Sequence, residues 1–148
     1  MIRVQEEDFD TGAEMEKLVR GKSDIGAIVS FVGVVRDSPD RPLVAMTLEH
    51  YPGMTERELQ RIEAEAQSRW PLSASLIIHR YGRLSVGEQI VLVITASAHR
   101  QAAFDAANFL MDWLKTQAPF WKLEETDDGA RWVEADRSDD AAARRWSK

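Results

Sequence analysis

Two lysines near the end of the longest helical pattern are the strongest candidates for chemistry in this sequence. Lys115 and Lys122 are separated by the turn TQAPFW, in which Pro119 disfavours helical geometry at the preceding residue and so ends the helix. If this turn folds back, the two ammonium groups come together, partly removed from water by Phe120 and Trp121, and each lowers the pKa of the other. One lysine could then act as base or nucleophile while the other stabilises a developing oxyanion. The structural alternative is also strong, because the macrodipole alone favours a cation at a helix C-terminus.

Three further cationic side chains could bind an anion. His99 and Arg100 stand where an apolar strand passes into a helix, so a phosphate there would meet both free helix amides and a guanidinium. Arg36 directly follows another apolar strand and could converge with Arg100 on the same anion. Glu124 shares a strand face with Lys122 and could orient it or simply pair with it. The structural alternatives are a solvated first-turn arginine, a partial histidine cap and a loop arginine in solvent.

Several other chemistries find no support in the sequence. The chain has no cysteine, which removes disulfides, thiolate metal sites and cysteine nucleophiles, and its three histidines are too scattered to predict a metal site. His50 and His79 are expected to be core or interface groups. Neither a glycine-rich phosphate loop nor a GxSxG elbow is present. Four of the five tryptophans, at residues 113, 121, 132 and 146, could line a pocket for a flat heterocycle, although packing is the default for each.

Charge and hydropathy restrict the partners and the compartment. The formal net charge of −6 argues against general binding to nucleic acid or to an anionic membrane. The N-terminal segment carries acidic residues where a signal peptide has an apolar run, and no apolar stretch approaches the roughly 18 residues of a membrane span. We therefore expect a cytoplasmic protein.

The pattern of apolar residues and turn formers predicts alternating strands and helices. The strands are expected at residues 2–5, 25–35, 44–51, 75–81 and 89–96, with a closing hairpin of residues 120–126 and 130–135. The helices are expected at residues 11–20, 55–69 and 99–117, with a short helix or frayed segment at 141–145. Continuous apolar runs predict that strands 25–35 and 89–96 are buried on both faces. The long helix is expected to pack through a stripe made of Phe104, Ala107, Leu110, Met111 and Leu114.

This order of elements predicts an α+β fold with a mixed or antiparallel sheet. At 148 residues the chain is long enough to bury one core without disulfides. We expect one domain over residues 1–135, followed by a polar C-terminal tail over residues 136–148.

Several motifs, in order and over essentially the whole chain, resemble one known family. They are FVGVVRD from residue 31, LEHYPGM from residue 48, RWPL from residue 69, the IHRxGxLxxG(D/E) run from residue 78, SAHR from residue 97, MDWLKTQAPFWK from residue 111 and RWVEA from residue 131. The family is that of the large, catalytic subunits of molybdopterin synthase. LEHYPGM and LKTxAPFWK together are highly specific to it.

The resemblance implies an α/β-hammerhead type of fold and a sulfur transfer reaction. Members of the family convert cyclic pyranopterin monophosphate to molybdopterin by installing a dithiolene. The sulfur arrives as a thiocarboxylate on the C-terminal Gly-Gly tail of a small ubiquitin-like subunit. Two large subunits pair at the centre of a heterotetramer. No permanently bound cofactor is implied, and a catalytic chain without cysteine fits a sulfur brought by its partner.

The resemblance also implies which residues act. Lys115 and Lys122 match the two functional lysines of the family, with Lys115 leading in proton transfer or a covalent intermediate and Lys122 assisting. The positions that match its substrate-contacting residues are Val34, Val35, Arg36, His99, Arg100, Lys115, Lys122, Leu123 and Glu124. Leu123 departs from the basic residue found in many relatives, and the loop from Ser38 to Pro42, with two prolines, has no obvious equivalent.

Two other functions agree with the same residues. The chain could be a non-catalytic module that binds a pterin or nucleotide phosphate, with the lysines only holding an anion. It could also be a structural dimerisation domain whose lysines are surface charges. A close approach of Lys115 and Lys122 around one pocket would count against the dimerisation domain, and loss of turnover without loss of substrate binding in Lys115→Ala would count against the binding module.

Overall fold

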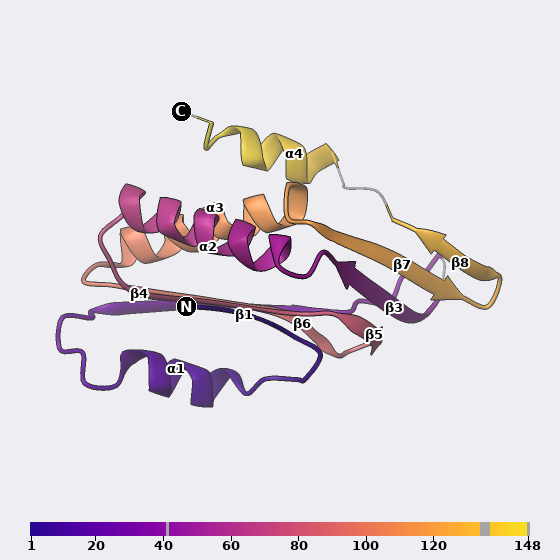
Figure 1. The fold of residues 1–148 in the computed structure, drawn as a ribbon, viewed down its shortest axis with the longest axis horizontal. Helices are drawn as coiled ribbons and strands as arrows, with labels where there is room; N and C mark the ends of the chain where they lie inside the picture. Colours follow the sequence, from indigo (N-terminus) through magenta and orange to yellow (C-terminus); the bar gives the residue numbers. More distant parts are fainter. Residues whose placement is uncertain (41, 134–136, 148) are drawn as a thin grey trace.

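The chain folds into a single α+β domain built on two four-stranded sheets (Figure 1). The computed structural model of the protein describes residues 1–40, 42–133 and 137–147. One sheet is mixed, because β1 runs parallel to β4, and the other is antiparallel throughout. The α+β class predicted from the sequence is confirmed.

The elements follow the predicted order closely. The strands are β1 (Ile2–Gln5), β2 (Ala27–Val34), β3 (Leu43–His50), β4 (Leu72–Arg80), β5 (Gly82–Ser85), β6 (Gln89–Ser97), β7 (Phe120–Thr126) and β8 (Gly129–Trp132). The helices are α1 (Thr11–Val19), α2 (Met54–Arg69), α3 (Arg100–Thr116) and α4 (Arg137–Arg144). Among the described helices, none is long and apolar enough to cross a membrane.

The larger sheet, with strand order β1-β4-β6-β2, forms the floor of the molecule. Helix α1 covers one of its faces, and α2 and α3 cover the other (Figure 1). Alternate residues of β4 therefore enter two different cores: Leu76 and Ile78 pack with α1, and Ile77 packs with α2 and α3. The same alternation in β6 makes that strand buried on both faces, as the sequence predicted.

The prediction that the strand near residues 25–35 is buried on both faces is wrong. Strand β2 pairs only with β6 and forms an edge of the larger sheet. Ile28, Phe31 and Val34 remain 39%, 39% and 50% exposed.

The predicted stripe of α3 is confirmed for Ala107 and Leu110, which are buried, and for Met111 and Leu114, which are partly buried. It is wrong for Phe104, which is 54% exposed, and it missed Phe109 and Trp113, which are buried as well.

The smaller sheet, with strand order β5-β3-β7-β8, extends from one end of the larger one (Figure 1). A small core formed by Val35, Leu43, Leu48 and Leu84 packs between the sheets. Strand β5 was not predicted, because Gly82, with a φ of 92°, turns the chain sharply away from β4 and starts a new strand against β3.

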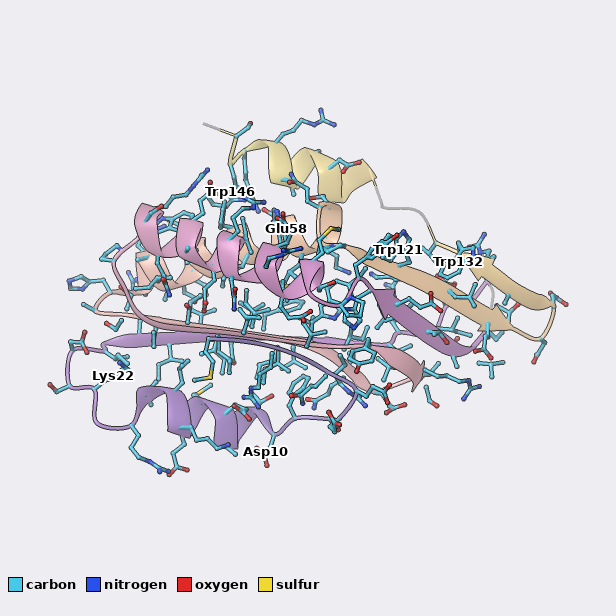
Figure 2. All side chains as sticks on the ribbon, in the orientation of Figure 1. Asp10, Lys22, Glu58, Trp121, Trp132 and Trp146 are labelled. Carbon is cyan, nitrogen blue, oxygen red and sulfur yellow. The ribbon has the colours of Figure 1, made fainter. Side chains whose placement is uncertain are left out.

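The C-terminal segment packs back over α3. The indole of Trp146 meets the rings of Trp70 and Phe109 edge to face, with centroid distances of 5.5 Å and 5.8 Å, and its Nε1 donates a hydrogen bond to Asp112. Figure 2 shows Trp146 above α2 and α3. The expected boundary between a domain and a polar tail, and the last residues of the expected second hairpin strand, fall at residues 134–136, outside the described residues.

Candidate active site

Lys115 and Lys122 flank a turn that reverses the chain between α3 and β7. Lys115 lies in the last turn of α3, which closes with a hydrogen bond from the Gln117 amide to the Trp113 carbonyl. The Phe120 amide donates to the Ala118 carbonyl at 2.8 Å and tightens the turn around the intervening proline. Strand β7 then returns with Lys122 opposite Leu48 of β3.

The two lysines lie near one buried imidazole, that of His79. The pKa of His79 is lowered from 6.5 to about 4: burial is the largest cause, a hydrogen bond to the Arg80 carbonyl opposes it, and the positive charges of Lys122, His50 and Lys115 add to the lowering. Lys115 and Lys122 are therefore both close enough to this ring to act on its protonation. The sequence predicted that the turn folds Lys122 back toward Lys115, and both lysines are found around His79.

The faces of β7 separate the aromatic residues of the turn. Phe120, Lys122 and Glu124 lie on one face of the strand, as alternation requires. Trp121 lies on the other face, where it meets Tyr51 at a centroid distance of 5.1 Å and stays 44% exposed. The expectation that Trp121 helps to remove the lysines from water is therefore wrong. Lys115 is exposed and Lys122 is half-buried.

Arg36 lies in a cleft beside the face of β7 that carries Lys122. A bulge between Gly33 and Val34 ends the regular pairing of β2, and Val35 is then fixed by backbone hydrogen bonds to the turn before β6. The exposed Arg36 follows directly. It lines a cleft of about 520 Å³ whose other lining residues are Asp37, Ser38, Asp40, Leu43, Met46, Glu124 and Arg131.

Arg131 was not among the predicted site residues. It stands opposite Glu124 in the β7–β8 pair, so both side chains project from the same face into the cleft. The turn at Asp127 and Asp128, which is closed by the pairing of Thr126 with Gly129, contains the signal that could have found it. That turn sets the register, and counting back from it places Arg131 beside Glu124.

The remaining predicted site residues of this region differ in exposure and in the direction of their side chains. Val34 is an exposed edge residue, and Val35 is buried in the small core. Leu123 stands between Thr47 and Trp132 on the face of the smaller sheet opposite to Lys122 and Glu124. Its side chain therefore points away from the cleft, and it could contact a ligand there only through its backbone.

His99 and Arg100 lie at the other end of α3. Gly26 passes so close to Ala98 that a Cβ at this glycine would come within 2.2 Å of the Ala98 carbonyl oxygen, and the Gly26 amide donates to the Ser97 carbonyl. The backbone that leads into the helix is thereby fixed. The side chains of His99 and Arg100 are exposed, and within the described part of the chain no hydrogen bond or ion pair is made by either.

Within one chain, His99 and Arg100 lie far from Lys115. The fifteen steps from Arg100 to Lys115 correspond to about 22 Å along the helix axis. Arg36 is remote as well, because β2 pairs with Ser97 at its first residue and with Gln89 at its last, which places Arg36 at the end of the strand far from His99. The sequence suggested that Arg36 could converge with Arg100 on one anion, and within one chain the two residues do not converge.

The described residues contain no group of three or more histidine, cysteine, aspartate or glutamate side chains that could hold a metal ion. The chemistry that the arrangement can support is therefore carried by cations. It consists of a lysine pair beside a neutral histidine, a cleft with two arginines and a carboxylate, and a separate His-Arg pair at a helix N-terminus.

Comparisons with known proteins agree on one family. Residues 4–117 match the family model described as MoaE protein. The chain is 60% identical to the molybdopterin synthase catalytic subunit of Pseudomonas aeruginosa, with 99% of each chain covered, and 56% identical to that of Mesorhizobium japonicum, with 98% of this chain and 92% of the relative covered. The solved structure of the molybdopterin biosynthesis MoaE protein from Burkholderia ambifaria superposes with a TM-score of 0.84 at 52% identity, covering 99% of this chain and 98% of that one.

Proposed function

We infer the roles of the site residues from the premise that this chain belongs to the MoaE family, the catalytic subunits of molybdopterin synthase. Its function is the conversion of cyclic pyranopterin monophosphate to molybdopterin. What each side chain contributes to that reaction is proposed here from the geometry.

We assign the leading catalytic role to Lys115 and an assisting role to Lys122. The observation that supports this assignment is the approach of both lysines to His79. Lys115 is exposed at the helix end and can reach a substrate, so it is suited to proton transfer or to a covalent intermediate. Lys122 is half-buried on a paired strand and is suited to stabilising negative charge that develops as sulfur is transferred.

The sulfur is proposed to come from a second protein. The chain has no cysteine, so it cannot carry a persulfide or thiolate of its own. The relatives that it matches are named as subunits, which implies a further component. We therefore propose a small ubiquitin-like partner whose C-terminal Gly-Gly thiocarboxylate reaches the lysine pair.

Substrate binding is proposed to use residues from two copies of this chain. The pterin would be held beside the lysines by one group of residues, which consists of Arg36, Glu124, Val34, Val35 and the backbone of Leu123. His99 and Arg100 would bind its phosphate through a guanidinium and free helix amides. Since about 22 Å of helix separates Arg100 from Lys115 in one chain, the two halves can meet only if a second copy supplies one of them.

The edge strand β2 suggests how the two copies pair. It exposes Ile28, Phe31 and Val34 beside unpaired backbone groups, a surface that favours pairing with another chain. The start of β2 lies beside Ser97, close to His99, and its end leads into Arg36. A two-fold axis that pairs two β2 edges antiparallel would therefore place His99 and Arg100 of one copy near Arg36 of the other.

This arrangement gives a central homodimer with two shared sites. With one small subunit at each site, the proposed assembly is a heterotetramer. We propose no permanently bound cofactor for this assembly, because the pterin enters as the substrate.

The experiment that tests the lysine assignment compares Lys115→Ala with wild type in a mixture of substrate and thiocarboxylated partner. We expect product formation to fall by about 10²- to 10⁴-fold, the contribution usual for a general acid or base, while substrate binding measured by calorimetry is retained. The matched control is Lys22→Ala, since Lys22 is an exposed lysine at the opposite end of the molecule from Trp121 and Trp132 (Figure 2). Full turnover by Lys115→Ala would refute the assignment, and a loss of substrate binding that accounts for the lost turnover would make the lysine a binding group only.

A further inference from the structure

His79 is buried beside the lysine pair, yet nothing assigned so far uses it. It is 6% exposed and lies on β4, on the face of the larger sheet that α2 and α3 cover. Its ring stacks on that of Phe120 with a centroid distance of 3.7 Å and an angle of 15° between the planes. Phe120 is the first residue of β7, immediately after the proline turn.

The protonation of the His79 ring is fixed by one hydrogen bond. Nδ1 lies 2.8 Å from the carbonyl oxygen of Arg80, which can only accept, so Nδ1 carries the proton and donates it. In a neutral ring Nε2 then holds the lone pair. The acceptor is itself held in place, because the Arg80 guanidinium donates to the carbonyls of Glu6 and Gln89 at 2.9 Å each.

The surroundings keep this ring neutral. The charged or titratable groups that act on it are His50 from β3, Lys122 from β7 and Lys115 from α3, and all of them disfavour an imidazolium. A cation at this position would in turn repel both ammonium groups. A neutral flat ring can therefore support the turn without disturbing the charges beside it.

The stack of His79 on Phe120 links the imidazole ring of His79 to the position of Lys122. Phe120 and Lys122 are two residues apart on β7 and lie on the same face. If the Phe120 ring shifts, the start of β7 shifts with it, and so does the point at which Lys122 returns toward Lys115. A displacement of about 1 Å can cost a catalytic group 10²-fold in rate.

We propose that His79 is a positioning residue for the lysine pair: its ring, held by the Arg80 carbonyl, keeps Phe120 stacked and so sets where Lys122 lies relative to Lys115. The proposal rests on the roles assigned to the two lysines above. It adds a residue that contacts neither substrate nor partner and acts through Phe120.

The kinetic test uses the complete enzyme with its thiocarboxylated partner. His79→Gln removes the flat ring and is expected to lower kcat about tenfold, with the KM for cyclic pyranopterin monophosphate within about twofold of wild type, because the binding residues are untouched. His79→Phe keeps a flat ring over Phe120 but loses the hydrogen bond to the Arg80 carbonyl, so it is expected to recover part of kcat. Wild-type kcat in His79→Gln, or failure of His79→Phe to exceed His79→Gln, overturns the proposal.

His50→Gln is the matched control. His50 is also an imidazole beside Phe120, but its centroid lies 6.0 Å from that ring and its plane is tilted by 36°, so it does not form the same stack. We expect a smaller loss of kcat than in His79→Gln. An equal or larger loss would show that proximity to Phe120, and not the stack, matters.

A measurement without turnover separates this proposal from the lysine assignment. ¹⁵N NMR of the His79 imidazole in the wild-type protein should show Nδ1 protonated and Nε2 unprotonated between about pH 5 and pH 8. A ring protonated on Nε2, or one that titrates near 6.5, would overturn the proposal even if Lys115→Ala is inactive. The predicted tautomer with a fully active Lys115→Ala variant would instead leave the ring geometry intact and refute the catalytic role assigned to Lys115.

Discussion

The two ends of α3 carry cationic residues in opposite settings. At the C-terminal end, Lys115 and Lys122 lie around the buried stack of His79 and Phe120, and a proline turn and a paired strand fix the chain there. At the N-terminal end, the backbone is equally fixed by the close approach of Gly26 to Ala98, but the side chains that follow it are exposed. The first end is organised within one chain, whereas the second presents its cations outward. The contrast agrees with the proposal that the N-terminal end completes a site on a second copy of the chain.

The largest effect is expected at the lysine end. Lys122→Ala should lower kcat by about 10²- to 10³-fold, the loss typical when one group that stabilises developing negative charge is removed. Lys122→Arg, which keeps the positive charge, should recover part of the rate. Steady-state product formation measures both variants, and a Lys122→Ala variant with unchanged kcat but raised KM would make this end a binding site like the other one.

A smaller effect, on binding, is expected at the helix N-terminus. Arg100→Ala removes a charge-assisted hydrogen bond to the phosphate, a contact of about 1.5–3 kcal/mol, so KM should rise about 10- to 100-fold with little change in kcat. Arg20→Ala is the control, because Arg20 is an exposed arginine that pairs only with Glu16 among the described residues. If Arg100→Ala lowers kcat and leaves KM unchanged, the two ends do not divide binding and catalysis as the comparison suggests.

The smallest effect concerns the backbone that supports the N-terminal end. Gly26→Ala forces a Cβ against the Ala98 carbonyl, and we expect the free energy of unfolding to fall by about 1–3 kcal/mol, a loss usual for overpacking. Gly12→Ala in α1 makes only an ordinary contact and should leave stability unchanged or raise it by about 0.5–1 kcal/mol. Urea denaturation compares the two variants. Equal stabilities would show that the approach at Gly26 is not tight in solution.

Most of the fold could be predicted from the sequence because its patterns are local. Prolines, other turn formers and apolar periodicity marked nearly every helix and strand within a few residues. The errors concern features that depend on which strands lie side by side in the sheet. The apolar run of β2 suggested two buried faces, yet its position at a sheet edge leaves Phe31 exposed. Strand β5 was missed because only its pairing with β3 makes it a strand.

The candidate site shows the same limit. The return of Lys122 toward Lys115 could be predicted, since a proline turn and an alternating strand are both local signals. The sequence could not show that His79 lies beside both lysines, because β4 reaches them only through the packing of the sheet against α3. The separation of Arg100 from Lys115, by contrast, could have been predicted, because a helix over residues 99–117 already places them about 22 Å apart.

Mixed dimers test the shared site most directly. Arg100→Ala and Lys115→Ala chains carrying different tags are co-expressed, and the dimers that contain one of each are purified. One of their two sites then has both intact halves, so activity measured as kcat/KM should be about half that of wild type, far above either variant alone. Dimers of wild type with the double variant Arg100→Ala/Lys115→Ala should be nearly inactive, because each site then has one damaged half. The reverse result, with inactive dimers of the two single variants and half-active dimers of wild type with the double variant, would show that each chain holds a complete site.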